Sequence, residues 1–230
     1  MSTQGKTLVE RTAETLIAFI HDQALQPGDK LPTEAELCVS LKVGRNTLRE
    51  ALKILASRNI VFIRQGAGAF VTEKPGVVED PLGFALISDR DKLTHDLMQV
   101  RAMLEPPIAA LAAQCATQAE IAQLETILSE MESAIREQKS FSALDMAYHR
   151  KIAECTHNTV MENLIPVIVN GVSVFAQEVE TPEYEQTLLS HRRIFEYIQN
   201  CQPFEAEMAM RFHILYNQNR YDVMQKKARS

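Results

Sequence analysis

Cysteine is scarce and scattered in this 230-residue sequence. The four cysteines are Cys38, Cys115, Cys155 and Cys201, and none of them belongs to a C-x-x-C pair. Closely paired cysteines are typical of disulfide frameworks and of thiolate zinc sites. The spacing here indicates reduced, buried thiols instead, and we assign them no functional role.

Long apolar runs are also missing. No stretch approaches the roughly 20 uninterrupted apolar residues of a membrane-spanning helix. The first residues, MSTQGKTLVERTAE, lack the apolar core of a secretion signal. The sequence therefore predicts a cytoplasmic protein without a membrane partner. Its hydrophobic content of 46% is enough for one large domain or two modest ones.

Positive charge is in short supply, because the net charge is -6. It is also uneven: residues 1–74 contain 10 Lys and Arg against 8 Asp and Glu, whereas the remainder contains 14 against 22. A nucleic-acid partner would therefore bind the first third of the chain. So small a positive excess does not establish such a partner by itself.

The chain divides near residue 75. Residues 1–74 contain three short helical patterns and two strand-like runs, IVFIR and AFVT, which the glycine-bearing QGAG joins into a predicted hairpin. The stretch EKPGVVEDP has no helical period, so residues 75–80 are a predicted linker. Residues 81–230 form the second predicted domain.

The second domain has helical periodicity throughout. Its predicted helices span 92–115, 118–138, 140–156, 159–180, 182–200 and 203–226. A further short helix can form in DPLGFALIS, and Pro166 predicts a kink in a central, heavily buried helix. The expected fold is mainly α, with an N-terminal helix-turn-helix and hairpin and a C-terminal antiparallel helical bundle.

Polar side chains crowd the first turns of the helix that is expected to begin at residue 45. They are Arg45, Asn46, Thr47 and Arg49. Such side chains contact base edges and phosphates when a helix enters the major groove, but they also solvate ordinary helices. The preceding helix, with a capping box of Thr33 and Glu36, and the following hairpin favour the DNA-reading interpretation.

Four polar residues fall on apolar helix faces in the second domain. They are Asp145, His149, His191 and His213, from three predicted helices. One oxygen and three nitrogens suit zinc, nickel, manganese or iron. A hydrogen-bonded polar core would place the same residues inward, so the pattern alone leaves both interpretations open.

Two further polar residues lie on apolar faces. An inward Arg101 is costly unless it is paired, and Glu105 one turn away is an available partner. Asn170 lies within an apolar helix, where it can bind a ligand hydroxyl or form a core hydrogen bond.

The N-terminal motifs LPTEAEL, R-x-x-L-R-E-A-L and G-A-G-A-F-V occur in order, and residues 8–72 resemble the winged helix-turn-helix of GntR-type bacterial transcription regulators. The resemblance implies that Arg45, Thr47 and Arg49 contact DNA from the recognition helix. It also implies that Gly66 enters the minor groove from the wing. The family often has an arginine where this chain has Ala35, which predicts a different operator preference.

Residues 92–226 resemble the FCD effector domain of the FadR subfamily. That resemblance implies that Asp145, His149, His191 and His213 bind a divalent transition metal, zinc in the first place and nickel or manganese as alternatives. It further implies that Arg101 binds a ligand carboxylate. Family members with fatty-acyl ligands lack the four metal residues, so their presence argues against such a ligand here.

Together, these features predict a homodimeric repressor of transcription that binds double-stranded operator DNA. A small organic acid, such as a sugar acid, is the expected effector. One alternative is a metal sensor in which the ion itself is the signal. Another is a metalloenzyme, which we do not expect because no separate general acid or base has a clear position.

Overall fold

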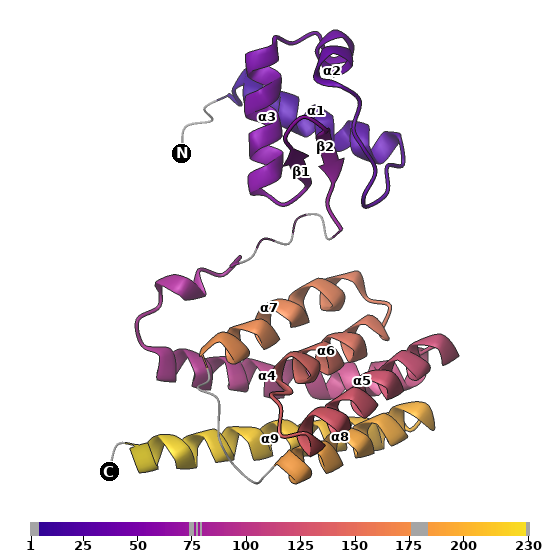
Figure 1. The fold of residues 1–230 in the computed structure, drawn as a ribbon, viewed down its shortest axis with the longest axis vertical. Coiled ribbons are helices and arrows are strands. Elements are labelled where there is room, and N and C mark those ends of the chain that lie inside the picture. Colours follow the sequence, from indigo (N-terminus) through magenta and orange to yellow (C-terminus); the bar gives the residue numbers. More distant parts are fainter. Residues whose placement is uncertain (1–4, 74–75, 77, 79, 176–183, 229–230) are drawn as a thin grey trace. The chain divides into compact units, whose positions relative to one another are not determined.

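The computed structural model describes residues 5–73, 76, 78, 80–175 and 184–228, which belong to two compact units, Met1–Pro81 and Leu82–Ser230. The expected fold class is confirmed, because the first unit has three helices and a two-stranded wing and the second is a helical bundle (Figure 1). Parts of the predicted 75–80 linker lie outside the described residues, so its bounds stay a prediction.

Three helices and a hairpin make up the first unit. They are α1 (Leu8–Asp22), α2 (Glu34–Leu41), α3 (Arg45–Ser57), β1 (Val61–Arg64) and β2 (Gly68–Val71). The strands pair antiparallel, with Val61 opposite Val71. Leucines from α1 and α3, Leu16, Leu48 and Leu55, are fully buried in a core that the two valines close from the wing.

The turn between α2 and α3 follows from local chemistry. The expected capping box is present: the Glu36 amide donates to Thr33 Oγ1 at 3.3 Å, and the Thr33 amide donates to Glu36 Oε2 at 2.8 Å. Helix α2 ends at Lys42, whose φ of +54° is left-handed, and α3 begins after Gly44. This turn leaves the first residues of α3 at the surface.

In the described residues of the second unit, a short 3-10 helix is followed by six α-helices. They are η1 (Phe84–Leu86), α4 (Arg90–Cys115), α5 (Gln118–Arg136), α6 (Ser142–Glu154), α7 (Thr159–Phe175), α8 (Tyr184–Gln199) and α9 (Pro203–Ala228). The predicted extension of the fourth segment to residue 180 reaches beyond the described residues. None of the helices in the described part of the chain is long and apolar enough to cross a membrane.

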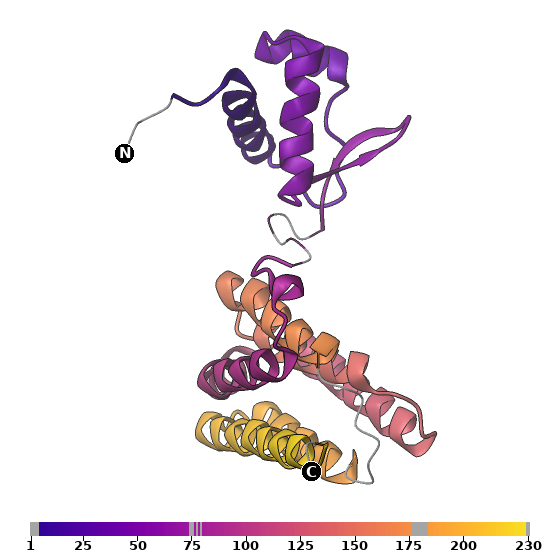
Figure 2. The same cartoon turned by 90° about the vertical axis from the view of Figure 1, so that its left-hand side faces the viewer.

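The bundle is arranged around α4, which packs along α9 and also contacts α6, α7 and α8. Figures 1 and 2 show α6 and α7 together on one side of α4, with α8 and α9 together on the other. Helix α7 differs from its sequence-based expectation, because its first half lies at the surface: Val160 is 70% exposed and Leu164 is 38% exposed. Its apolar residues are buried only from Ile165 onward.

Candidate metal centre and DNA-reading surface

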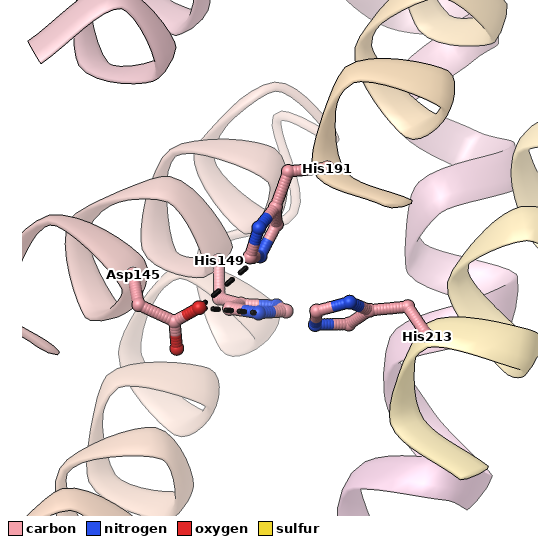
Figure 3. A group of neighbouring side chains, drawn as sticks. All are labelled: Asp145, His149, His191 and His213. Atoms are coloured by element: carbon pink, nitrogen blue, oxygen red, sulfur yellow. Dashed lines mark ion pairs between the residues drawn. The ribbon is translucent and has the colours of Figure 1, made fainter. Parts of the chain in front are cut away.

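Four side chains from three helices meet inside the second unit. Asp145 and His149 lie one turn apart on α6, His191 comes from α8 and His213 from α9 (Figure 3). Each histidine occupies a position where its helix is apolar and buried, so helical periodicity turns all three rings inward. The structure thus brings together the four residues that the sequence pattern selected.

The four residues are close enough to hold one ion. One ligand atom from each lies within 4.8 Å of the others. Asp145 Oδ1 is 3.1 Å from His191 Nε2 and 3.9 Å from His149 Nε2, and the His191 and His213 ring centroids are 4.3 Å apart. The histidines are at most 1% exposed. Three buried imidazoles and one partly exposed carboxylate therefore converge on a common point, with the Asp145 side chain 24% exposed.

The hydrogen bonding of these rings fits a metal site. Among the described residues, His149 Nε2 and His191 Nδ1 are buried without a hydrogen bond, and His191 Nε2 has its 3.1 Å contact with Asp145 Oδ1. Leaving such buried groups unpaired costs about 1–3 kcal/mol each. A metal ion takes one nitrogen from each ring, so it would give His149 Nε2 the partner that the protein does not supply.

The protonation states also suit a metal. Burial lowers the pKa of His191, and burial beside two other imidazoles lowers that of His213 well below its usual value. Burial alone would raise the pKa of Asp145, but its contact with His191 and its electrostatic interactions with His149 and Arg101 hold that pKa below the usual range. Neutral imidazole and ionised carboxylate are the forms that bind metal.

Glu105 on α4 supports His149 from outside the cluster. Its Oε2 lies 2.5 Å from His149 Nδ1, an ion-pair contact rather than a well-aligned hydrogen bond, and Oε1 pairs with Arg101 Nε. Burial would raise the pKa of Glu105, yet Arg101 and His149 lower it to about 2. An ionised carboxylate at Nδ1 favours the tautomer whose Nε2 lone pair faces Asp145.

A comparable contact orients His213. Ser190 Oγ donates to the Thr187 carbonyl at 2.6 Å and lies 2.7 Å from His213 Nδ1. Because the Ser190 hydroxyl donates its proton to the Thr187 carbonyl, its oxygen accepts a hydrogen bond from His213 Nδ1–H. The lone pair of His213 is then on Nε2, which faces the site. Asn217 Nδ2 donates to that Nε2 at 3.2 Å, so a metal bound at Nε2 would replace this hydrogen bond. Spacing along the sequence does not reveal the Glu105–His149 and Ser190–His213 contacts, since each joins two different helices.

Arg101 and Asn170 both have protein partners. The buried Arg101 forms the ion pair with Glu105 that the sequence left open, and its Nη2 donates to Glu105 Oε2 at 3.4 Å. Its Nη1 lies 4.0 Å from Met98 Sδ, a weak acceptor. Asn170 is half-buried and its Oδ1 accepts a hydrogen bond from Arg150.

The predicted DNA contacts lie at the surface of the first unit. Arg45, Asn46 and Arg49 are exposed at the start of α3, and Thr47 is half-buried. Arg49 Nε donates to Glu34 Oε2 on α2 at 2.9 Å, but both side chains stay largely in solvent, so the pair is weak. The pair links α3 to α2 while the Arg49 side chain stays exposed.

The wing adds a basic and aromatic cluster that the sequence reasoning missed. Gly66 at its tip has φ +75°, a conformation that favours glycine. Phe62 and Phe70 stack with ring centroids 5.3 Å apart, and the Arg64 guanidinium carbon lies 5.5 Å from the Phe70 ring. Lys30 Nζ is 6.0 Å from the same ring. In the sequence, this cluster was indicated only by Arg64, which ends the strand-like run IVFIR next to the predicted wing tip.

Both units of the chain match known protein families. Residues 8–71 match the family described as "Bacterial regulatory proteins, gntR family", and residues 96–216 match the FCD domain. The chain is 31% identical to the galactonate operon transcriptional repressor of Escherichia coli, over 80% of this chain and 83% of the relative. It is 29% identical to the Glc operon transcriptional activator of the same species, over 93% and 89%.

Among solved structures, Streptococcus agalactiae GntR superposes with a TM-score of 0.83 at 38% identity, covering 92% of this chain and 99% of that one. The likeness therefore extends over both units and is not confined to the common DNA-binding module.

Proposed function

The chain belongs to the GntR family of bacterial regulatory proteins, in the FadR subfamily with an FCD domain, and from this premise we propose that it is a metal-dependent, ligand-responsive repressor. It is a DNA-binding transcription regulator and not an enzyme. The finer proposal is that it binds operator DNA as a homodimer and that a small carboxylate metabolite releases it. The observation that carries this proposal is the cluster of three buried histidines, His149, His191 and His213, with the half-buried Asp145.

In this proposal the four side chains hold one divalent transition metal, with zinc as the first candidate and nickel or manganese as alternatives. A bound metal supplies a Lewis-acidic centre for ligand oxygens. The buried His149 Nε2, which has no hydrogen bond among the described residues, supports the assignment. The residues of the chain then bind and orient the ligand.

Arg101 remains the proposed partner of a ligand carboxylate. Glu105 engages its Nε and Nη2, whereas Nη1 has only the weak sulfur contact, so donors remain for a second acceptor. Asn170 is the proposed partner of a ligand hydroxyl. A galactonate operon regulator among the relatives favours a sugar acid, which combines a carboxylate with hydroxyls.

An effector changes operator affinity only if it favours one dimer arrangement over another. In the proposed mechanism, Arg45, Asn46, Thr47, Arg49 and Gly66 bind the operator when the spacing of the two recognition helices matches the half-sites. The ligand stabilises a different spacing, and the coupling is reciprocal, so operator DNA must weaken ligand binding by the same factor.

The effector class can be tested with a thermal-shift screen of metal-loaded protein. We expect a sugar acid at about 100 times its dissociation constant to stabilise the fold by about 2.7 kcal/mol, or roughly 5–10 °C. Arg101→Lys should keep metal and operator binding but lose about tenfold or more in ligand affinity, because Lys lacks the bidentate fork. Arg136→Lys, at the exposed end of α5, is the matched control.

Two outcomes would contradict this assignment. Full ligand affinity in Arg101→Lys would leave Arg101 as a structural partner of Glu105 alone. If operator affinity responds to the metal and to none of the acids, the protein is instead a sensor whose signal is the ion.

Glu105→Gln tests the support of His149. We expect metal affinity to fall about 10–100-fold, because the neutral amide no longer holds the imidazole in its binding tautomer. Isothermal titration with zinc measures the change, and Glu130→Gln on the exposed face of α5 is the control. Unchanged affinity would reduce Glu105 to a counter-ion for Arg101.

A further inference from the structure

A buried hydroxyl on α8 has no partner within the described part of the chain. Thr187 is 4% exposed, and its Oγ1 has no hydrogen bond among the described residues. Thr187 lies one helical turn before His191, on the same buried face of α8. A buried hydroxyl without a hydrogen bond destabilises a fold, and such groups are rare in native proteins. The Thr187 hydroxyl is therefore placed to bind a group that comes from outside the chain.

Asn217 on α9 contacts the nitrogen that a metal would take. His213 Nδ1 donates to Ser190 Oγ, so the ring's lone pair is on Nε2, where it accepts from Asn217 Nδ2 at 3.2 Å. Figure 3 shows the His213 ring directed from α9 toward the other three side chains of the cluster. When Nε2 binds metal, the Asn217 amide loses this acceptor and is available for another partner.

Thr187 and Asn217 lie toward the same end of the metal cluster. Helices α8 and α9 pack side by side and are joined by residues 200–202, so they run antiparallel. The contact of Ser190 with His213 fixes the register of this pair. Thr187 lies one turn toward the start of α8 and Asn217 one turn toward the end of α9, so both are displaced from the histidines in the same direction.

The guanidinium of Arg101 extends in that direction too. The start of α4 lies beside the end of α9, where Tyr221 Oη donates to Asp91 Oδ1 at 3.2 Å (Figure 1). Arg101 Nη1 lies 4.0 Å from the sulfur of Met98, which is nearer the start of α4. A guanidinium, a hydroxyl and an amide are thus displaced toward one end of the second unit from three different helices.

We propose that Thr187 and Asn217 form a hydroxyl-binding subsite, which selects acids that carry hydroxyls along their chain. Both side chains donate and accept hydrogen bonds, as an alcohol does, and neither has the positive charge that would favour a second carboxylate. The inference rests on the proposed function, in which the metal and Arg101 hold the ligand's carboxylate. It adds the residues that bind the remainder of the ligand.

The distance of the subsite from the metal ligands selects for ligand length. Four residues of helix span about 6 Å along the axis. A hydroxyl beside the carboxylate, as in glycolate, stays at the metal, whereas hydroxyls further along a six-carbon chain reach the level of Thr187. The subsite therefore favours six-carbon aldonic acids over short hydroxy acids.

Thr187→Val tests the hydroxyl with little change of shape. Isothermal titration of metal-loaded protein uses a panel of six-carbon aldonic acids, including gluconate, with hexanoate as the match without hydroxyls. We expect wild type to prefer the best aldonic acid, and Thr187→Val to lose about 3–10-fold in affinity for it and nothing for hexanoate. Without ligand, the variant should melt about 2–6 °C higher, because an unpaired buried hydroxyl is removed.

The control for this variant is Thr126→Val on α5. Thr126 is exposed and its hydroxyl donates to the Ala122 carbonyl, so its loss should neither raise the melting temperature nor change ligand affinity. A merely structural Thr187 would not combine a more stable fold with weaker binding of hydroxylated acids alone.

Asn217→Ala tests the amide through two effects of opposite sign. Zinc affinity should rise about 2–10-fold, because the metal no longer competes with a hydrogen bond for His213 Nε2, while affinity for the aldonic acid should fall about 3–10-fold. Asn219→Ala is the matched control, since Asn219 is exposed on the same helix. If Asn217 only positioned His213, its loss would instead lower zinc affinity.

These titrations separate the subsite from the proposed function. Equal losses for the aldonic acid and hexanoate in Thr187→Val, a lower zinc affinity in Asn217→Ala, or a wild type that binds hexanoate as tightly as every aldonic acid would overturn the subsite alone. A wild type that binds neither metal nor any carboxylate would overturn the subsite together with the proposed function.

Discussion

Alanine at His191 or His213 should reduce metal affinity by about 100-fold or more, a larger loss than for the supporting Glu105. Each substitution removes one of four converging ligands and leaves a buried cavity beside an ionised carboxylate. Elemental analysis should find up to one divalent metal per wild-type chain and much less in either variant. His157→Ala is the control, because His157 pairs with Glu120 outside the cluster.

Metal removal provides an independent readout in the wild-type protein. At about 100 times its dissociation constant, the metal adds about 2.7 kcal/mol to the free energy of unfolding, so chelation should lower the melting temperature by roughly 5–10 °C. In His191→Ala this difference should nearly disappear. Wild type that neither contains metal nor gains stability with zinc, nickel or manganese would leave the four residues as a polar core network.

The second large effect concerns operator binding. Arg45→Ala and Arg49→Ala should each weaken it by about 1–3 kcal/mol if the guanidinium groups contact bases, and the double variant should lose about 100-fold or more. Arg49 should contribute less than Arg45, because binding DNA requires it to leave or share its contact with Glu34.

Gel-shift titrations at one fixed salt concentration measure these losses, since phosphate contacts make affinity salt-dependent. Arg58→Ala is the control, because this exposed residue follows the opposite end of α3. If both recognition-helix variants fold and bind the operator as tightly as wild type, α3 does not read this operator. The wing, with Arg64 and Lys30 beside its aromatic pair, would then be the next surface to test.

Short sequence patterns predicted those elements whose defining contacts lie within a few residues of one another. The capping box of Thr33 and Glu36 marks the start of α2, and the two apolar runs around QGAG predict the hairpin, because these contacts lie within a few residues. Periodicity also predicts that Asp145, His149, His191 and His213 face inward. Their joint role as ligands came from the resemblance to the FCD domain, since inward polar residues also form core networks.

Contacts between distant segments required the folded chain. The sequence offered Glu105 as a partner of Arg101, and only the packing of α4 against α6 shows that Glu105 also contacts His149. Periodicity also made α7 a central helix, although its first half is exposed, because apolar content does not specify which neighbours cover a helix.

The sequence by itself determined the two-part organisation, the helical periods, the caps and the direction in which each polar side chain leaves its helix. Helix α9 marks the limit of that information, because apolar residues occur on more than one of its sides and periodicity does not say which of them the bundle covers. Only the tertiary structure decided that Met210 and Ile214 are buried while Phe204 and Phe212 remain exposed. A period sets angles around one helix axis, whereas burial depends on how several axes pack together.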